Sequence, residues 1–361
     1  MPGNPSSVHG YGRALRTEID RARASVAALV GVEPSAVTFT SGATEANALA
    51  LIGAWRALTR KRQERPFRIL TSPIEHASVR EALAALATDG AVIDTLPVGA
   101  GGVVSAADVA AAITPDTVLV SVMWVNNVLG TVQPVAEIGK VVAAERVRRG
   151  AAGLPILFHC DAVQALATLE VMPGEAGIDL MTLSGHKICG PKGAGALIRA
   201  FGATIEPIVM GGGQEGGLRH GTENAAGIAG LGRAAGILAE ERKDEAVRTA
   251  ALRTLLGCEL ASRVPTAKIV GDRTQSSPGI VFLTMSGIPG DRLALALDAA
   301  GIAVSAGSAC DSGKRRRSHV LSAVLDERHA AHGGVRVSFG RFTEETDMRA
   351  FAEALAHIPA H

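Results

Sequence analysis

The apolar positions of this chain alternate between short continuous runs and longer segments with helical spacing. Residues 12–30 place Leu15 and Ile19 on one helical face, and Gly31 follows at the position of a C-terminal cap. The first segment is therefore predicted to be a helix that packs on the rest of the molecule. A short apolar run at residues 37–40 comes next and predicts a strand.

Strand and helix patterns continue to alternate through the first half of the chain. Apolar runs predict strands at residues 68–71, 91–96, 117–125 and 155–160, and helical spacing predicts helices at 46–59, 77–87, 106–113 and 135–148. Repeated strand–helix alternation is typical of an α/β fold in which helices cover both faces of a mostly parallel sheet. Ligands of such sheets bind at the carboxyl ends of the strands.

The pattern changes in the second half of the chain. Further strands are predicted at residues 178–183 and 193–199, a glycine-rich loop at 211–215, and a long alanine-rich helical region to about residue 256. Charge rises near residue 240, so we predict a large domain over residues 1–240 and a smaller one over 241–361. The second domain is expected to hold strands near residues 280–283, 303–304 and 335–339 and a helix at 291–300.

Composition favours a soluble globular enzyme. The 361 residues are 47% hydrophobic and 20% charged, and the net charge is +1 with both signs interspersed. This balance argues against nucleic acid or an anionic membrane as the main partner. The first residues lack the basic start and apolar middle of a secretion signal, and no apolar run is long enough to cross a bilayer, so the cytoplasm is the expected compartment.

Four cysteines lie far apart, without paired spacing, at positions 160, 189, 258 and 310. This spacing indicates neither a zinc site nor a disulfide framework, and no metal site is expected. Cys310 stands in a loop of small residues, 306–313, whose composition predicts mobility, and an exposed free thiol there usually has a reason. The basic run 314–317 would favour the thiolate, although an ordinary surface cysteine beside a solvated basic loop is the alternative.

The segment after the first predicted strand has the features of an anion site. Ser41-Gly42-Ala43-Thr44 forms a turn of small residues that leads into a predicted helix. Backbone N–H groups and the helix dipole converge at such a helix N-terminus, and Thr44 adds a hydroxyl.

Other polar residues follow the carboxyl ends of the predicted strands. They are His76, Asn126, Asn127, Asp161 and the stretch Ser184-Gly185-His186-Lys187. Some have a simpler explanation: His76 would cap its helix, Asn127 would form the turn before Gly130, and Asp161 would cap the helix after it. Together, however, they would place a carboxylate, an imidazole and a lysine beside the anion site.

Asp161 and Lys187 point toward one cofactor. Asp161 and Gln164 are three residues apart, a spacing that on one helical turn directs both side chains the same way. A carboxylate held against a pyridine nitrogen keeps that nitrogen protonated, as pyridoxal phosphate requires. Lys187, at the mouth of a buried strand, would suit a Schiff-base lysine in apolar surroundings that keep its amine neutral. A loop lysine that merely reaches solvent is the alternative.

With these motifs the chain resembles the pyridoxal-phosphate-dependent cysteine desulfurases, which have fold type I and are of the class V aminotransferase type. The matching stretches, from Gly3 to about Thr343, are GNPSSVH, TSGATEAN, EHASV, VNNVLGTVQP, DAVQ, SGHKICGPKG, RHGTEN, GSAC and VRVSFGRFT. SGHK with GSAC at this distance is the specific part of the match. The distance from Cys310 to Ser318-His319-Val320-Leu321 resembles that in members with the longer mobile cysteine loop. The resemblance implies a seven-stranded, mostly parallel sheet between helices and a smaller α+β C-terminal domain.

The resemblance also implies roles for single residues. Lys187 would bind the cofactor and move the substrate Cα proton, His76 would stack on the cofactor ring and help with proton transfer, and Cys310 would be the nucleophile. Asp161 would pair with the pyridine nitrogen, and Gln164 would bond the ring oxygen. The phosphate contacts would be Ala43, Thr44, Ser184, His186 and, from a second protomer, Thr222; the substrate carboxylate contacts would be Arg336 and Asn127, and Asn127 would also contact the cofactor.

The implied reaction converts L-cysteine to L-alanine and leaves a persulfide on Cys310. A homodimer would then deliver this sulfur to an acceptor such as an iron–sulfur scaffold, or to other thio-cofactors. A selenocysteine lyase and a class V aminotransferase are alternatives with the same fold. A non-catalytic sulfur carrier is a further alternative, because family members usually begin earlier, with a strand and an Asp-x-x-Ala-Thr turn that help to build the substrate entrance.

Overall fold

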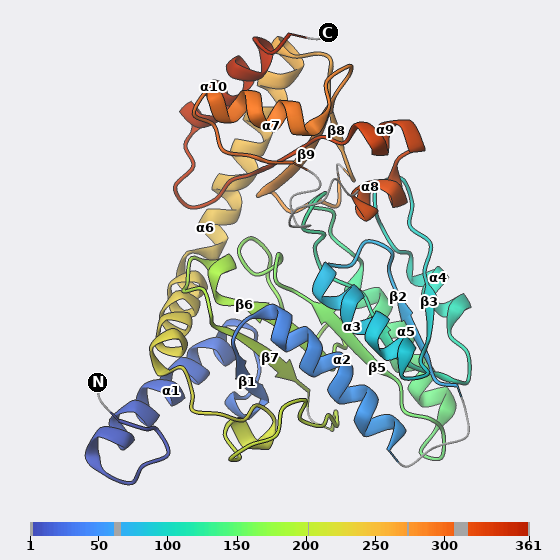
Figure 1. Ribbon diagram of the computed structural model, residues 1–361, viewed down its shortest axis with the longest axis vertical. Helices are drawn as coiled ribbons and strands as arrows, with labels where there is room; N and C mark the ends of the chain where they lie inside the picture. Colours follow the sequence, from blue (N-terminus) through green and yellow to red (C-terminus); the bar gives the residue numbers. More distant parts are fainter. Residues whose placement is uncertain (1–2, 61–65, 201, 273, 307–316, 360–361) are drawn as a thin grey trace. The chain divides into compact units, whose positions relative to one another are not determined.

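The computed structural model describes residues 3–60, 66–200, 202–272, 274–306 and 317–359 (Figure 1). The chain divides into two compact units. The first consists of Met1–Leu96, Ser105–Trp124 and Pro134–Glu241, and the second of Pro97–Val104, Val125–Gln133 and Arg242–His361. Two short segments from the first half of the chain thus belong to the second unit.

A seven-stranded sheet forms the centre of the first unit. Its strands are β1 (Val37–Thr40), β2 (Arg68–Thr71), β3 (Val92–Thr95), β4 (Thr117–Ser121), β5 (Leu157–Asp161), β6 (Leu180–Ser184) and β7 (Gly195–Arg199). They lie in the order β1-β7-β6-β5-β4-β2-β3. Strand β7 is antiparallel to both of its neighbours, and the remaining neighbours run parallel. The expected mostly parallel, seven-stranded sheet is therefore confirmed.

Helices accompany this sheet in the order that the sequence predicts. They are α1 (Gly10–Leu29), α2 (Ala43–Thr59), α3 (Ala77–Thr88), α4 (Ala106–Ala112) and α5 (Val135–Arg149), with the 3-10 turns η1 (Pro34–Ala36), η2 (Gly185–Ile188) and η3 (Glu215–Gly217). Helix α6 (Ala225–Arg263) begins in the first unit and continues in the second. Helix α2 begins three residues before its predicted start, directly after Gly42. No helix in the described part of the chain is both long and apolar enough to cross a membrane.

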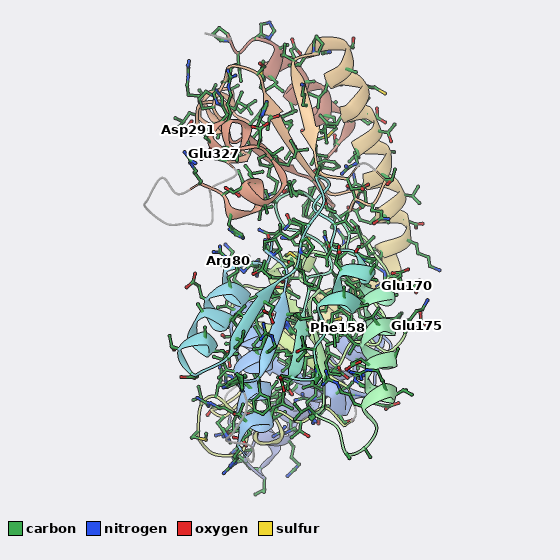
Figure 2. All side chains as sticks on the ribbon, turned by 90° about the vertical axis from the view of Figure 1, so that its right-hand side faces the viewer. Arg80, Phe158, Glu170, Glu175, Asp291 and Glu327 are labelled. Atoms are coloured by element: carbon green, nitrogen blue, oxygen red, sulfur yellow. The ribbon has the colours of Figure 1, made fainter. Side chains whose placement is uncertain are left out.

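One face of the sheet changes from apolar to polar toward the carboxyl ends of its strands. In β5, Leu157 packs in an apolar cluster with α2 and α3, and His159 and Asp161 follow on the same face at two-residue spacing. The fully buried Phe158, labelled in Figure 2, belongs to the opposite face. Strands β4 and β6 repeat this pattern with Leu119 and Ser121, and with Leu180, Thr182 and Ser184.

The second unit contains a four-stranded antiparallel sheet in the order β10-β11-β9-β8. Its strands are β8 (Ala267–Val270), β9 (Ile280–Met285), β10 (Ser305–Ala306) and β11 (Val335–Ser338), and its helices besides α6 are α7 (Gly290–Ala299), α8 (His319–Val324), α9 (Glu327–His332) and α10 (Glu345–Ala356). The strand predicted at residues 303–304 is wrong by two positions, because the chain pairs with β11 only from Ser305 onward. Strand β8, α8, α9 and α10 had no counterpart in the sequence patterns.

Gly195 holds β7 close to the start of α2. It pairs with Ser184 in the β6 ladder and with Thr40 in the β1 ladder. A Cβ atom at Gly195 would lie 2.7 Å from the Cα of Gly42 and 2.8 Å from the carbonyl oxygen of Leu183. This close approach brings the end of β6 and the N-terminus of α2 to the same corner of the sheet.

The substitution Gly195→Ala is expected to lower the free energy of unfolding by about 1–3 kcal/mol, because the added methyl group has to displace backbone at Gly42. Chemical denaturation measures this change. Gly236→Ala in α6 is the matched control, since its Cβ would meet no atom within 4 Å outside its own helix turn. Alanine there is expected to stabilise the helix by roughly 0.5–1 kcal/mol. Wild-type stability of Gly195→Ala would contradict the close approach.

Candidate functional site

Asp161 ends β5 at the centre of the polar edge of the sheet, where it is buried. Asn47 of α2 donates from Nδ2 to Oδ2 of Asp161 at 2.8 Å, and the Val163 N–H donates to Oδ1 at 3.1 Å. Burial raises the pKa of Asp161, whereas these two hydrogen bonds and the nearby His76 lower it. The carboxylate is thus buried against donors and well suited to pair with a further cationic N–H group.

The chain turns immediately after Asp161, and this differs from the helix that the sequence suggested. Residues 163–168 form consecutive turns, in which the Ala165 N–H donates to the Ala162 carbonyl at 2.9 Å. Asp161 itself closes the first turn through its bond to Val163. The idea that Asp161 caps a following helix is therefore wrong, and Gln164, which is half-buried, stands on a turn rather than on a helical face.

His76 lies between β2 and α3 and caps that helix. Its Nδ1 accepts the Ser78 N–H at 3.1 Å and lies 2.8 Å from Ser78 Oγ. The simpler explanation from the sequence, that His76 is a helix cap, is confirmed. The cap engages only Nδ1, so it orients the imidazole ring. A chemical role for His76 remains compatible with the cap.

The N-terminus of α2 supplies backbone donors at the same edge. Gly42 precedes the helix with φ 153° and provides no side-chain cap, and the first helical bond runs from the Ala46 N–H to the Gly42 carbonyl. The N–H groups of Ala43 and Thr44 come before that bond and have no acceptor within the helix. These N–H groups and the helix dipole are the features from which the sequence predicts an anion cradle, and the cradle stays a prediction.

Ser184 ends β6 beside this cradle. It is fully buried, and its Oγ lies 2.9 Å from Nδ1 of His186. Its ladder partner Gly195 contacts Gly42, so the Ser184 hydroxyl and the start of α2 occupy one corner. A hydroxyl, an imidazole and helix N–H groups are a donor set that suits a phosphate.

Lys187 follows in the 3-10 turn η2, where its side chain is exposed. The described residues therefore do not give this lysine the apolar surroundings that the sequence reasoning required. Burial lowers the pKa of His186, and the charges of Lys187 and Lys192 lower it further. These influences favour neutral His186.

Glu75 is a buried acid that the sequence reasoning missed. Ser72 Oγ donates to Glu75 Oε1 at 2.5 Å, and the Met123 N–H donates to the same oxygen at 2.9 Å. Burial raises the pKa of Glu75 to about 8, with the charge of Asp161 as a smaller cause, although both hydrogen bonds lower it. Glu75 is therefore a neutral carboxylic acid at pH 7. In the sequence, the available signal for Glu75 was its position between the predicted strand at residues 68–71 and His76.

Two further polar residues behind Asp161 also escaped the sequence reasoning. Asn47 and His159 are both 0% exposed, and His159 Nε2 lies 3.1 Å from Asn47 Oδ1. The signals were periodic: Asn47 interrupts an alanine- and leucine-rich helix, and His159 precedes Asp161 by two residues on the same strand face.

The second unit brings Asn127 and Arg336 together. Arg336 Nη1 donates to the Asn127 carbonyl at 3.0 Å, and Nη2 donates to Ser305 Oγ at 3.2 Å. Asn127 lies in the turn directly before Gly130, which spans residues 127–129, so the simpler explanation offered for it is confirmed. Asn126 caps this turn, because its Oδ1 accepts the N–H groups of Val128 and Leu129.

Two candidates from the sequence remain, Thr222 and Cys310. Thr222 is exposed in the first unit. Cys310 lies outside the described residues, whereas Cys160, Cys189 and Cys258 are free cysteines. Within the described part of the chain, no group of three His, Cys, Asp or Glu side chains is arranged to hold a metal ion.

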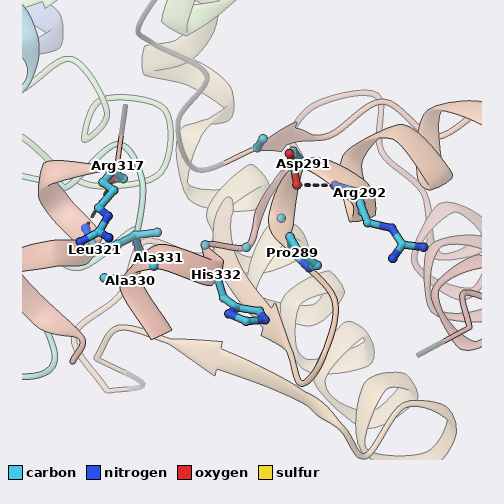
Figure 3. Close-up of a pocket in the computed structure, with 13 residues that line it drawn as sticks. Pro289, Asp291, Arg292, Arg317, Leu321, Ala330, Ala331 and His332 are labelled. Atoms are coloured by element: carbon cyan, nitrogen blue, oxygen red, sulfur yellow. Dashed lines mark hydrogen bonds between the residues drawn. The ribbon is translucent and has the colours of Figure 1, made fainter. Parts of the chain in front are cut away.

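A pocket of about 410 Å³ lies in the second unit beside the start of α7 (Figure 3). Its lining residues are Pro289, Gly290, Asp291, Arg292, Ala306, Arg317, Ser318, Leu321, Ala330, Ala331, His332, Gly333 and Gly334. None of them is a cofactor, substrate or catalytic residue predicted from the sequence, whereas Ala306 belongs to the predicted cysteine loop 306–313 and Arg317 to the basic run 314–317.

Comparisons with known proteins agree over nearly the whole chain. The family described as aminotransferase class-V matches residues 1–351. The cysteine desulfurase IscS of Dictyoglomus turgidum is 38% identical over 356 residues, which cover 99% of this chain and 87% of that protein. A solved NifS-like protein has a TM-score of 0.88 at 33% identity, with 98% of this chain and 90% of that chain covered. A structure of SspA in complex with cysteine has a TM-score of 0.77 at 33% identity, covering 93% and 90%.

The substitution Glu75→Gln is expected to change how stability depends on pH. Below its ordinary pKa of 4.5 the buried acid contributes its full stabilisation, and this is lost as pH rises through the folded-state value of about 8. Wild type should therefore lose stability relative to Glu75→Gln, on the order of a few kcal/mol, between pH 5 and pH 8.

Denaturant unfolding at several pH values measures this difference. Glu240→Gln, the same chemical change at an exposed position of α6, is the matched control and should leave the pH dependence unchanged. A constant stability difference between wild type and Glu75→Gln across that pH range would show that Glu75 is not held neutral.

Proposed function

Because this chain belongs to the class V aminotransferase family, we propose that it is a cysteine desulfurase that uses pyridoxal 5'-phosphate. It would convert L-cysteine to L-alanine and keep the sulfur as a persulfide on Cys310. The observation that carries this proposal is that Asp161, His76, Lys187 and the N-terminus of α2 all follow strand ends at one edge of the seven-stranded sheet. Similarity to a named cysteine desulfurase over 99% of the chain supports the choice of substrate.

The phosphate of the cofactor fits the corner formed by α2 and β6. The N–H groups of Ala43 and Thr44, with the side chains of Ser184 and His186, would bind it. The helix start is open, since a Cβ on Gly42 would meet no atom within 4 Å. Thr222, which is exposed on this chain, would contribute from a second protomer.

The ring of the cofactor fits the buried carboxylate. Asp161 would bind the protonated ring nitrogen, and the new cation would offset the burial that raises the pKa of this carboxyl. Gln164 would donate to the ring oxygen, His76 would lie over the ring face, and Asn127 would make a further contact. When bound, pyridoxal phosphate supplies an electron sink for the substrate Cα.

Lys187 and Arg336 would handle the substrate. The Lys187 amine would hold the cofactor and then carry the proton that leaves and rejoins the substrate Cα. Arg336 would bind the substrate carboxylate with its fork of N–H donors, next to Asn127.

Cys310 would take the sulfur. Its thiolate would attack the sulfur of the bound cysteine, so that a sulfur–sulfur bond forms while the carbon–sulfur bond of the substrate breaks. The substrate carbon then gains a proton, and L-alanine leaves. The sulfur on Cys310 would pass to an acceptor such as an iron–sulfur scaffold or to other thio-cofactors.

A homodimer is part of the proposal. The first unit exposes large apolar side chains close to its chain start and in the loop before η3, namely Val8, Tyr11, Val209 and Met210. Apolar side chains of this size favour burial against a partner. A second copy would cover them and bring its Thr222 to the phosphate.

Release of alanine and sulfide from L-cysteine, with a reductant present, tests the proposed reaction. Wild type is expected to release both products, and Cys310→Ala is expected to lose roughly a thousandfold or more in rate because the nucleophile is gone. Cys258→Ala, at an exposed position in α6, is the matched control and should keep wild-type rates. Full turnover by Cys310→Ala would favour an aminotransferase or lyase reaction without a persulfide.

Arg336→Lys tests the carboxylate contact. This variant keeps the charge and loses the fork of donors, so the KM for L-cysteine is expected to rise roughly ten- to a hundredfold with a smaller change in kcat. Ser305→Ala, which removes one hydrogen bond of Arg336 and keeps the guanidinium, should change the KM by less than about threefold. An unchanged KM in Arg336→Lys would remove Arg336 from the substrate site.

A further inference from the structure

A continuous chain of hydrogen bonds lies behind the carboxylate of Asp161 in the first unit. Ser121 Oγ lies 2.9 Å from His159 Nδ1, and His159 Nε2 lies 3.1 Å from Asn47 Oδ1. The Asn47 amide nitrogen lies 2.8 Å from Asp161 Oδ2 and 2.9 Å from Ser78 Oγ. The chain therefore branches at Asn47.

The chemistry of the groups fixes the direction of these bonds. A carboxylate only accepts hydrogen bonds, so the NH2 group of Asn47 has to face Asp161. The amide oxygen then faces His159, and because that oxygen also only accepts, His159 must carry its proton on Nε2. The Asp161 carboxylate thus fixes the orientation of the Asn47 amide, and the amide fixes the tautomer of His159.

His159 is held in this one tautomer. Burial lowers its pKa to about 3, so the ring is neutral at pH 7. With the proton on Nε2, Nδ1 accepts from the hydroxyl of Ser121. Every polar atom of the imidazole is thereby satisfied without a charge, as a fully buried ring requires.

The second branch ends at His76. Ser78 Oγ accepts one hydrogen from Asn47, which directs its own hydrogen toward His76 Nδ1 at 2.8 Å. The Ser78 backbone N–H donates to the same ring nitrogen. Two donors thus point at Nδ1, so that in the neutral form of the ring the proton lies on Nε2.

We propose that Asn47 is a positioning residue that couples Asp161 to His76. Its single amide holds the carboxylate that would face the cofactor ring nitrogen and, through Ser78, orients the imidazole that would lie over the ring. Asp161 fixes the orientation of this amide, and the amide oxygen in turn fixes the tautomer of His159. The proposal rests on the proposed function for the parts of the cofactor that Asp161 and His76 would face, while the hydrogen-bond directions rest on the structure of the chain alone.

The position of Asn47 supports this role over a purely structural one. It is fully buried on the face of α2 that otherwise contributes Ala50, Leu51 and Ala54 to the apolar cluster. An apolar residue would fit that cluster without needing partners. The asparagine instead uses its amide group to bond two elements: β5, through Asp161 and His159, and α3, through Ser78.

Nitrogen NMR of the cofactor-free full chain, labelled at histidine, tests the coupling directly. In wild type the His159 signals are expected to show a protonated Nε2 and an unprotonated Nδ1. Ser121→Ala should keep this tautomer, because the Asn47 oxygen dictates it, and Asn47→Leu should change it. Wild-type His159 with its proton on Nδ1 would overturn the proposal without any variant.

The affinity for pyridoxal phosphate gives a second readout. Asn47→Leu is expected to bind the cofactor roughly ten- to a hundredfold more weakly, because a hydrogen bond to a charged group is lost. Ser78→Ala cuts the branch to His76 alone, so it should alter the His76 nitrogen signals and keep the affinity within about threefold.

Thr182→Val is the matched control for removal of a buried polar group. Thr182 pairs with Asp161 in the β5–β6 ladder, and its hydroxyl has no hydrogen-bond partner among the described residues. This variant should leave both the His159 tautomer and the cofactor affinity unchanged. Equal affinity of wild type and Asn47→Leu would overturn the proposal. Failure of wild type to bind the cofactor would instead refute the proposed function, and the tautomer would still decide the coupling.

Discussion

A buried carboxylate needs donors, and the donors that Asp161 requires organise the functional edge of this protein. Asp161 ends the central strand β5, where it receives the Asn47 amide from α2 and the Val163 N–H from the turn that follows. Neither donor is a cation, and burial raises the pKa of Asp161, which favours its protonated form. A positively charged ring nitrogen would satisfy the carboxylate fully, and this demand links the fold to the proposed cofactor.

The sheet topology places the other groups around this carboxylate. Parallel strands end at one edge, and the two-residue period takes β4, β5 and β6 from a leucine to a polar residue at the end of the strand, as in Leu157 and Asp161 of β5. Antiparallel β7 then brings Gly195 between Ser184 and the N-terminus of α2. Residues that are far apart in sequence thus lie close together because of the strand order and because Gly195 has no side chain.

Much of the fold could be predicted from the sequence, and the site only in part. Short apolar runs located the strands of the large sheet because buried parallel strands are continuous in hydrophobicity. The helix expected after Asp161 is a turn, since the Asp161 side chain bonds the Val163 N–H and competes with helix formation. Glu75 and Asn47 escaped because their importance depends on burial and on partners from other elements, which no local pattern contains.

Reductive trapping of the bound cofactor, followed by mass spectrometry of the peptides, tests the central claim most directly. The protein would be loaded with pyridoxal phosphate, treated with borohydride and digested. The expected result is a single pyridoxyl group on Lys187, which follows the strand end that lies beside the cradle of α2. A pyridoxyl group on Lys192, or on no lysine, would contradict the proposal that this edge of the first unit holds the cofactor.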